Sequence, residues 1–208
     1  MNCVRAESAL MAVAAEHPML QYHENNEVKG PSAEILKLLL QHSQLQAPLE
    51  LLPWSRAYQT VLNRENTLVV SMVRTQARED KFHWLIKVSE LERGFVSLKS
   101  RPENRIETLI EARSKTIIVI RDSYGYHSLV NLGFSEKTNL YVVSSLKHGI
   151  ALFLSGKVDL IFTDPNVLID FFAEQQQNAE ALISVHVLPE RRRESYIAAN
   201  INTESGML

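Results

Sequence analysis

Residues 66–84 have the sequence NTLVVSMVRTQAREDKFHW. The apolar run at 68–70 predicts a buried strand, because β-branched residues fit a covered, pleated surface. We expect this strand to run out at Ser71, with Arg74 and Arg78 following it. Arginines placed there form a positive rim at the carboxyl edge of a sheet, where open α/β sheets bind ligands. Since a guanidinium matches the geometry of a carboxylate or phosphate, the stretch predicts an anion-binding site.

The composition narrows the classes of protein that this chain can be. With 208 residues and 45% hydrophobic content, it can bury a core as one large domain or two small ones. A net charge of −2 gives no basic surplus, so we expect no nucleic-acid partner. The single cysteine, Cys3, excludes an internal disulfide framework and a multi-cysteine metal site. The histidines show no zinc-ligand spacing, and we expect no metal and no cofactor.

The start of the chain makes a poor secretion signal. Its apolar piece, residues 9–15, is preceded by Glu7 and closed by Glu16, so it has neither a basic region before it nor sufficient length. Nothing apolar precedes Cys3, which argues against a lipoprotein. No apolar run approaches the length of a membrane span. These features predict either a cytoplasmic protein or one whose export signal has been removed.

Outward from 66–84, apolar patterns predict strands that alternate with helices. Further strands are expected at 10–14, 49–52, 93–98, 116–120, 139–143, 160–162, 185–188 and 195–199, a hairpin-like loop at 22–30, and helices at 32–42 (capped by Ser32), 54–62, 104–112, from about 125 to 132, 145–154 and 166–174. Such alternation indicates an α/β fold with largely parallel pairing. The pattern runs twice without a flexible linker. We expect two lobes, residues 1–92 plus 195–208 and residues 93–194, joined by crossing strands.

Several stretches, in this order, carry a resemblance to a known family. They are VAAEHP at 13–18, YHENNEVKG at 22–30, LPWSRAY at 52–58, VRTQARE at 73–79 with FHW at 82–84, LSGKVDLIFTD at 154–164, and YIA at 196–198. Together they resemble the periplasmic solute-binding proteins of amino-acid ABC transporters (bacterial extracellular solute-binding protein family 3). The resemblance implies the type II periplasmic binding protein fold: α/β and two-lobed, each lobe a mostly parallel sheet flanked by helices, with two crossing strands between the lobes.

The resemblance also implies roles for individual residues. Arg78 would hold the α-carboxylate of the ligand, Asp164 its α-ammonium group, and Ser71 would add a hydroxyl. Trp54 lies where an aromatic platform usually covers the ligand side chain. The remaining candidates are Arg74, the Ser123 and Tyr124 pair in the turn that receives an anion at a helix N-terminus, and Glu16 at the end of the first strand.

Most of these candidates have a purely structural alternative, which the sequence leaves open. Asp164 and Ser123 are equally good helix caps, and Trp54 could belong to the core. For Arg74 the alternative is that it pairs with a neighbour such as Glu79 and has no role in binding a ligand. Tyr124 could stack on a ligand or pack outward.

The function implied by the resemblance is capture of a small zwitterionic or anionic ligand between the lobes, without catalysis. The location would be periplasmic, and the partner an ABC transporter permease or a membrane sensor. Two alternatives remain: a ligand-sensing domain of a signalling system, and a cyclohexadienyl dehydratase-like enzyme with Glu16 as general acid. The basic run Arg191–Arg193 is expected to be a solvated turn at the second crossing, or a contact with a membrane partner.

Overall fold

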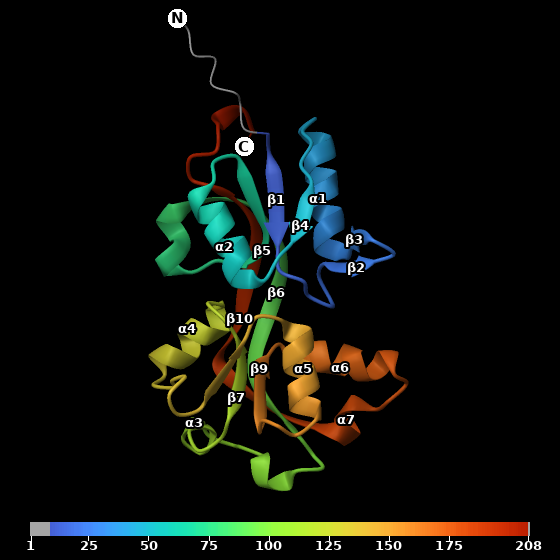
Figure 1. Ribbon diagram of the computed structural model, residues 1–208, viewed down its shortest axis with the longest axis vertical. Helices are drawn as coiled ribbons and strands as arrows, with labels where there is room; N and C mark the ends of the chain where they lie inside the picture. The colour runs from blue at the N-terminus through green and yellow to red at the C-terminus, as the bar shows by residue number, and fades with distance from the viewer. Residues whose placement is uncertain (1–8, 208) are drawn as a thin grey trace, which may run out of the picture. The chain divides into compact units, whose positions relative to one another are not determined.

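Figure 1 shows the computed structural model, which describes residues 9–207, with the backbone alone at 188–191. Cys3, and with it the lipoprotein question, lies outside the described residues. The chain divides into two compact units. Unit 1 contains residues 9–16, 20–89 and 194–207, and unit 2 contains residues 17–19 and 90–193. None of the helices within 9–207 combines the length and the hydrophobicity needed to cross a membrane.

Unit 1 is built on a short, mostly parallel sheet. Strand β1 (Met11–Ala14) lies between β4 (Leu49–Leu51) and β5 (Thr67–Val73) and is parallel to both. The C-terminal part of β10 (Ile183–Asn200) pairs antiparallel with β5. Helices α1 (Pro31–His42) and α2 (Trp54–Asn63) flank this sheet, and β2 (Tyr22–Glu24) forms a hairpin with β3 (Glu27–Lys29), as expected for 22–30 (Figure 1). Because β1, β4 and β5 run in the same direction, their carboxyl ends lie at the same edge of the sheet as the residues that follow β5.

Strand β5 does not stop at Ser71, so that expectation was wrong. The pairing of Met72 with Tyr196 and of Val69 with Ala198 leaves two residues of β5 opposite one residue of β10. Ser71, one of the two, has a φ of +63°. This arrangement is a β-bulge, which bends a strand and re-aims a side chain without ending the pairing.

Helix α1 begins at a glycine rather than at Ser32, which was the predicted cap. The N-cap residue is Gly30, with a φ of +111°. A Cβ at Gly30 would lie 2.5 Å from the Leu20 carbonyl oxygen, so only glycine fits without a shift of the backbone. The Ser32 N–H donates to that same carbonyl at 3.0 Å, which holds the start of the helix against the preceding loop.

Unit 2 is a second α/β layer structure. Its sheet has the strand order β6 (Phe82–Leu98), β9 (Leu160–Thr163), β7 (Ile117–Ile120), β8 (Leu140–Val143); β7 is parallel to both of its neighbours and β9 is antiparallel to β6. Its helices are α3 (Leu109–Ala112), α4 (Tyr124–Asn131), α5 (Leu146–Leu154), α6 (Pro165–Glu174) and α7 (Ala179–Leu182). Two apolar clusters, one around Phe153 and the other around Phe95, form its core.

Two sequence expectations for the second half of the chain were wrong. The strands expected at 185–188 and 195–199 are one continuous strand, β10, so Arg191–Arg193 is strand rather than a turn. The helix expected at 104–112 shrinks to α3, because the Thr108 hydroxyl accepts from the Glu111 N–H at 3.3 Å and caps the helix there. The chain passes from unit 2 to unit 1 within β10, and no glycine or proline at that point marks the end of a strand. Local pattern therefore could not show that the two predicted strands are one.

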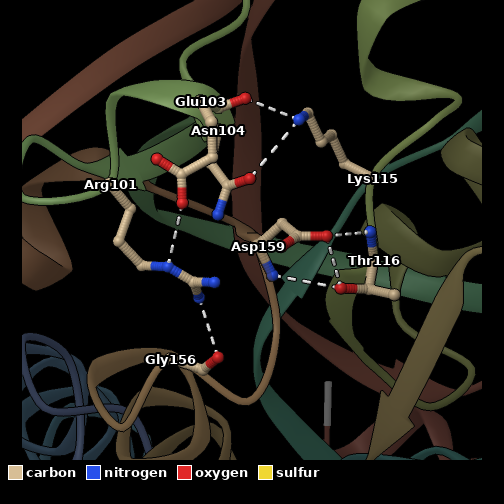
Figure 2. Close-up of polar contacts among 7 residues, drawn as sticks. All are labelled: Arg101, Glu103, Asn104, Lys115, Thr116, Gly156 and Asp159. Atoms are coloured by element: carbon tan, nitrogen blue, oxygen red, sulfur yellow. Dashed lines mark hydrogen bonds and ion pairs between the residues drawn. The ribbon is translucent and has the colours of Figure 1, made fainter.

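A polar network ties together the starts of two strands in unit 2 (Figure 2). The Asp159 carboxylate, just before β9, accepts from the N–H and the hydroxyl of Thr116, just before β7, at 2.8 and 2.7 Å. Burial acts to raise the pKa of Asp159, but these hydrogen bonds outweigh it and leave the pKa lowered. Beside it, Arg101 donates to the Gly156 carbonyl at 2.7 Å. The parallel pairing of β7 and β9 thus begins at a fixed register.

Candidate functional site

The most distinctive group of unit 1 is the guanidinium of Arg78. It comes from the 3₁₀ helix Gln76–Lys81, directly after β5. Its guanidinium carbon lies 5.0 Å from the ring centroid of Tyr58 and 5.3 Å from that of Trp54. Its Nη1 donates to the Val73 carbonyl at 2.9 Å. Only 5% of the side chain's surface is exposed, so the charge is held in a fixed place against two aromatic faces.

Arg78 is a buried cation without a carboxylate. Within residues 9–207, no aspartate or glutamate forms an ion pair with it. Burial lowers the pKa of Arg78, and only the Tyr58 side chain acts in the opposite direction. A guanidinium remains charged under such conditions. A buried charge without a counter-ion is costly, so this site favours the arrival of an anion.

The second aromatic partner, Tyr58, was missed by sequence reasoning. Trp54 is the first residue of α2 and is buried, and Tyr58 lies one turn later on the same helix face. The two rings lie 5.9 Å apart. Trp54 therefore serves the core and contacts Arg78 at once. The spacing of four residues was the available signal, but nothing in it pointed to a cation between the rings.

Arg74 is engaged by its own neighbours. Its Nε donates to Glu79 at 2.9 Å, and its guanidinium lies over the rings of Trp84 and Tyr196, at 5.4 and 5.5 Å from their centroids. The hydrogen bond to Glu79 raises the pKa of Arg74. The structural alternative for Arg74, a pair with Glu79, is confirmed.

The Ser71 hydroxyl also has a hydrogen-bond partner within its own chain. It donates to the side-chain oxygen of Gln21 at 2.8 Å, and the Gln21 amide donates in turn to the Ala15 carbonyl at 2.7 Å. Gln21 is 2% exposed. The bulge at Ser71 therefore fixes a buried polar side chain, and the hydroxyl retains only its acceptor capacity for any ligand.

Glu16 lies in an ordinary surface setting. Its side chain is 53% exposed, and its nearest ionisable partner is His23, with Oε1 3.9 Å from Nδ1. A carboxyl group that acts as general acid at neutral pH relies on burial or on a neighbouring like charge. Glu16 is not buried, and its ionisable partner among the described residues is a histidine rather than another acid.

In unit 2, Asp164 acts as a helix cap. One carboxylate oxygen accepts from the backbone N–H and side-chain amide of Asn166, at 3.0 and 3.1 Å, at the start of α6. The other accepts from the Glu92 N–H in β6 at 3.0 Å. The residue is 3% exposed. The cap expected as the alternative is confirmed, and Asp164 also links α6 to β6.

Ser123 and Tyr124 have similar structural roles. The Ser123 hydroxyl accepts from the Tyr126 N–H at 3.1 Å and caps α4, as its alternative predicted. Tyr124 is partly buried; its hydroxyl accepts from Arg193 Nε at 2.9 Å, and the Arg193 guanidinium lies over its ring, 5.6 Å from the centroid. Arg193, the last residue of the basic run, therefore packs on an aromatic ring and is not fully solvated.

Sequence reasoning missed two further groups of unit 2, Arg93 and His17. Arg93, in β6, donates from Nη1 to the Glu92 carbonyl at 3.0 Å. Burial lowers the pKa of Arg93, while the charges of Asp164 and then Tyr124 act to raise it. Burial, and next the charge of Arg93, lower the pKa of His17 to about 3. No local sequence pattern indicates these effects on the pKa values, because His17 and Arg93 are far apart along the chain.

No protein-family model matches the chain, and no curated protein matches it. Among solved structures, the arginine-, lysine-, histidine-binding protein ArtJ from Geobacillus stearothermophilus superposes with a TM-score of 0.78 at 16% identity, covering 95% of this chain and 86% of that one. The substrate-binding protein of an amino acid ABC transporter gives 0.75 at 14% identity, with 96% and 88% covered. A histidine kinase sensor domain similar to periplasmic binding proteins gives 0.77 at 13% identity, with 92% and 82% covered.

The chain has the type II periplasmic binding protein fold. The predicted fold class, α/β with two lobes and mostly parallel sheets flanked by helices, is confirmed. At these identities the likeness establishes the periplasmic binding protein fold alone. Whether the site residues act on a ligand stays a prediction.

Proposed function

We propose that the chain is a solute-binding protein that captures a small molecule bearing a carboxylate, such as an amino acid or a related compound. The observation that carries this proposal is the Arg78 guanidinium, which is buried against Trp54 and Tyr58 and has no carboxylate partner among residues 9–207. A ligand carboxylate would supply the missing counter-charge through a planar, two-pronged contact.

The neighbours' names support a binding function of this kind. ArtJ binds arginine, lysine and histidine, and another neighbour serves an amino acid ABC transporter. By analogy we propose that this chain delivers its ligand to such a transporter from a periplasmic location. Fold analogy alone carries that part of the proposal.

The predicted contact between Asp164 and a ligand ammonium group remains a proposal. The Asp164 carboxylate already accepts three hydrogen bonds from its own chain. Carboxylate oxygens offer about four acceptor positions, which leaves one for an additional donor. The cap and the ammonium contact are therefore compatible but have to be separated by experiment.

A sensory role is the second candidate, because one neighbour is a histidine kinase sensor domain. The same binding chemistry would serve a signalling partner. The adjacent genes distinguish the two roles: genes for a permease and an ATPase support transport, and a gene for a kinase or another sensor protein supports signalling.

The binding function is tested by a thermal-shift screen against the common amino acids and small organic acids. A ligand that binds the folded state raises the melting temperature by mass action. Calorimetry then measures the affinity of each hit for the wild type, for Arg78→Gln, and for Arg56→Gln as the control. Arg56 is an exposed arginine on α2.

Removing one partner of a desolvated ion pair costs about 3–5 kcal/mol, which is about a hundred-fold to several-thousand-fold in affinity. We expect a loss of this size for Arg78→Gln and none for Arg56→Gln. Equal affinities for all three proteins would remove Arg78 from the site and overturn the proposal.

A further inference from the structure

The short 3₁₀ helix Gln76–Lys81, which carries Arg78, is held in place by contacts from outside itself. It is six residues long, and the side chain of Thr75, its N-cap residue, makes no capping hydrogen bond. A 3₁₀ helix has poorer hydrogen-bond geometry than an α-helix, and runs of more than three or four residues are uncommon. The position of Arg78 therefore depends on the neighbours that fix this segment against the rest of unit 1.

Glu79, the residue after Arg78, is joined by a two-pronged contact to Arg74, which directly follows β5. Arg74 Nε donates to one Glu79 carboxylate oxygen at 2.9 Å, and Arg74 Nη2 donates to the other. The planar fork of a guanidinium fixes the direction as well as the distance of such a carboxylate. Arg74 is itself anchored, because its backbone N–H donates to the Glu194 carbonyl of β10 at 3.1 Å. The end of the sheet thus holds the 3₁₀ helix through Glu79.

Trp84 gives Glu79 a second anchor. Its indole Nε1 donates to the Glu79 carbonyl at 3.2 Å. The Arg74 guanidinium lies over the rings of Trp84 and Tyr196, whose centroids are 5.7 Å apart. Both aromatic faces attract the cation, which keeps Arg74 in the orientation that its contact with Glu79 needs. Glu79 is therefore fixed at its carboxylate by one residue and at its backbone by another.

A row of five aromatic rings connects the Arg74 contact to Arg78. Neighbouring centroids lie between 5.7 and 6.0 Å apart, and the rings are, in order, those of Trp54, Tyr58, Phe82, Trp84 and Tyr196. Arg78 lies against the first two rings and Arg74 against the last two. Phe82, in the middle, is 3% exposed. Because a close-packed interior transmits strain, the two arginines are linked by packing as well as by the backbone.

We propose that Glu79, held by Arg74 and Trp84, is a positioning residue that keeps the Arg78 guanidinium where a ligand carboxylate can reach it. Arg74 then affects binding without touching the ligand. The inference rests on the proposed function, because it concerns the same guanidinium. The competing explanation is that Arg74 and Glu79 form a surface ion pair with no effect on Arg78, and such pairs typically contribute little.

Charge and position make opposite predictions for Glu79. Glu79→Ala removes a negative charge near Arg78, so electrostatics alone would strengthen the binding of an anion, whereas loss of positioning would weaken it. Arg74→Lys keeps the positive charge but cannot make the two-pronged contact, so it weakens binding only if geometry matters. The matched control is Glu34→Ala, which removes an exposed glutamate of α1 that pairs with Lys37.

The first measurement is the NMR resonance of the Arg78 Nε–H in the protein without a probe, assigned by its loss in Arg78→Gln. The rings of Trp54 and Tyr58 should move this resonance away from that of an exposed arginine. We expect Glu79→Ala to move it back towards that value and Glu34→Ala to leave it in place. The same resonance in Glu79→Ala as in the wild type overturns the positioning role, because a contribution of Glu79 to stability alone would leave Arg78 where it is.

The second measurement is the affinity for a carboxylate, with acetate and the amino acids of the thermal-shift screen as probes. Each titration is followed at the Arg78 resonance. We expect Glu79→Ala and Arg74→Lys to bind about three-fold or more weakly than the wild type and Glu34→Ala, given the modest contribution of an exposed ion pair. Arg74→Lys also keeps the proposal testable if Glu79→Ala does not fold. Equal or tighter binding by either variant overturns the role.

The wild type distinguishes failure of this role from failure of the proposed function. If neither acetate nor any of the amino acids moves the Arg78 resonance of the wild type, the proposed function fails and the positioning role fails with it. If a probe binds the wild type and Glu79→Ala equally well, the proposed function stands and only the positioning role is overturned.

Discussion

The guanidinium of Arg78 lies over the ring of Tyr58, with 5.0 Å between the guanidinium carbon and the ring centroid. The aromatic face compensates a buried positive charge that has no carboxylate partner within residues 9–207. Nη1 donates to the Val73 carbonyl and Tyr58 also hydrogen-bonds with the guanidinium, which leaves the other N–H groups of its planar fork for an anion. A buried charged group normally has its hydrogen-bonding groups paired within the protein. Arg78 is buried and still has N–H donors that a ligand anion could accept from.

Replacing Tyr58 should therefore affect the cation as well as the packing. We expect Tyr58→Leu, which retains apolar volume, to reduce the free energy of unfolding by about 2 kcal/mol, because a desolvated cation–π contact is worth about that much or more. Urea denaturation measures this change. Tyr141→Leu, at an exposed position in unit 2, is the control and should change stability little. Equal effects of the two substitutions would contradict a specific contact with Arg78.

Gly30 should not tolerate a side chain. Its φ is +111°, and a Cβ would lie 2.5 Å from the Leu20 carbonyl oxygen. We expect Gly30→Ala to destabilise the protein by more than about 1 kcal/mol in urea denaturation, since both strain and a backbone clash oppose it. Gly206→Ala is the matched control, because nothing lies within 4 Å of a Cβ there. A Gly30→Ala protein as stable as the Gly206→Ala protein would refute the clash.

Two substitutions separate the roles of Asp164. Asp164→Ala removes the cap of α6 and should cost about 0.5–2 kcal/mol of stability, whereas Asp170→Ala, at an exposed position of the same helix, should cost less. Asp164→Asn keeps an oxygen acceptor for the cap but removes the charge. Its amide NH2 then faces the Glu92 N–H, so Asp164→Asn should also lose some stability. If Asp164 receives an ammonium group, Asp164→Asn should weaken binding of an amino acid at a temperature where the variant is fully folded. Unchanged calorimetric affinity would leave Asp164 with the cap alone.

His17 should make the stability of the protein depend on pH. Its pKa is about 3 in the folded state and about 6.5 when unfolded, so the unfolded state binds more protons between these values. Stability from this group is therefore fully present above pH 6.5 and falls as the pH drops towards 3. We expect His17→Asn, which keeps an acceptor for the Met19 N–H, to unfold in urea with a shallower pH dependence than the wild type. Identical slopes would mean that His17 titrates normally.

Local pattern was sufficient to predict much of the fold. Runs such as Thr116–Ile120 and Leu160–Phe162 predict strands because β-branched and apolar residues favour buried pleats, and β7 and β9 lie there. Helix caps could also be predicted from local pattern, because Ser123 and Asp164 accept from N–H groups only two or three residues away. Ser71 shows the limit, since its bulge depends on pairing with Tyr196 and Ala198, which are distant in sequence.

The sequence by itself determined the alternation of elements, several helix caps and the position of Arg78 after a buried strand, because these depend on neighbours along the chain. Only the tertiary structure decided that Arg78 lies buried on Tyr58, that Arg74 pairs with Glu79, and that Arg193 packs on the ring of Tyr124. The charge and hydrogen-bonding capacity of a side chain are inherent in its residue type. Which partners compensate them is set by packing between segments that the sequence separates.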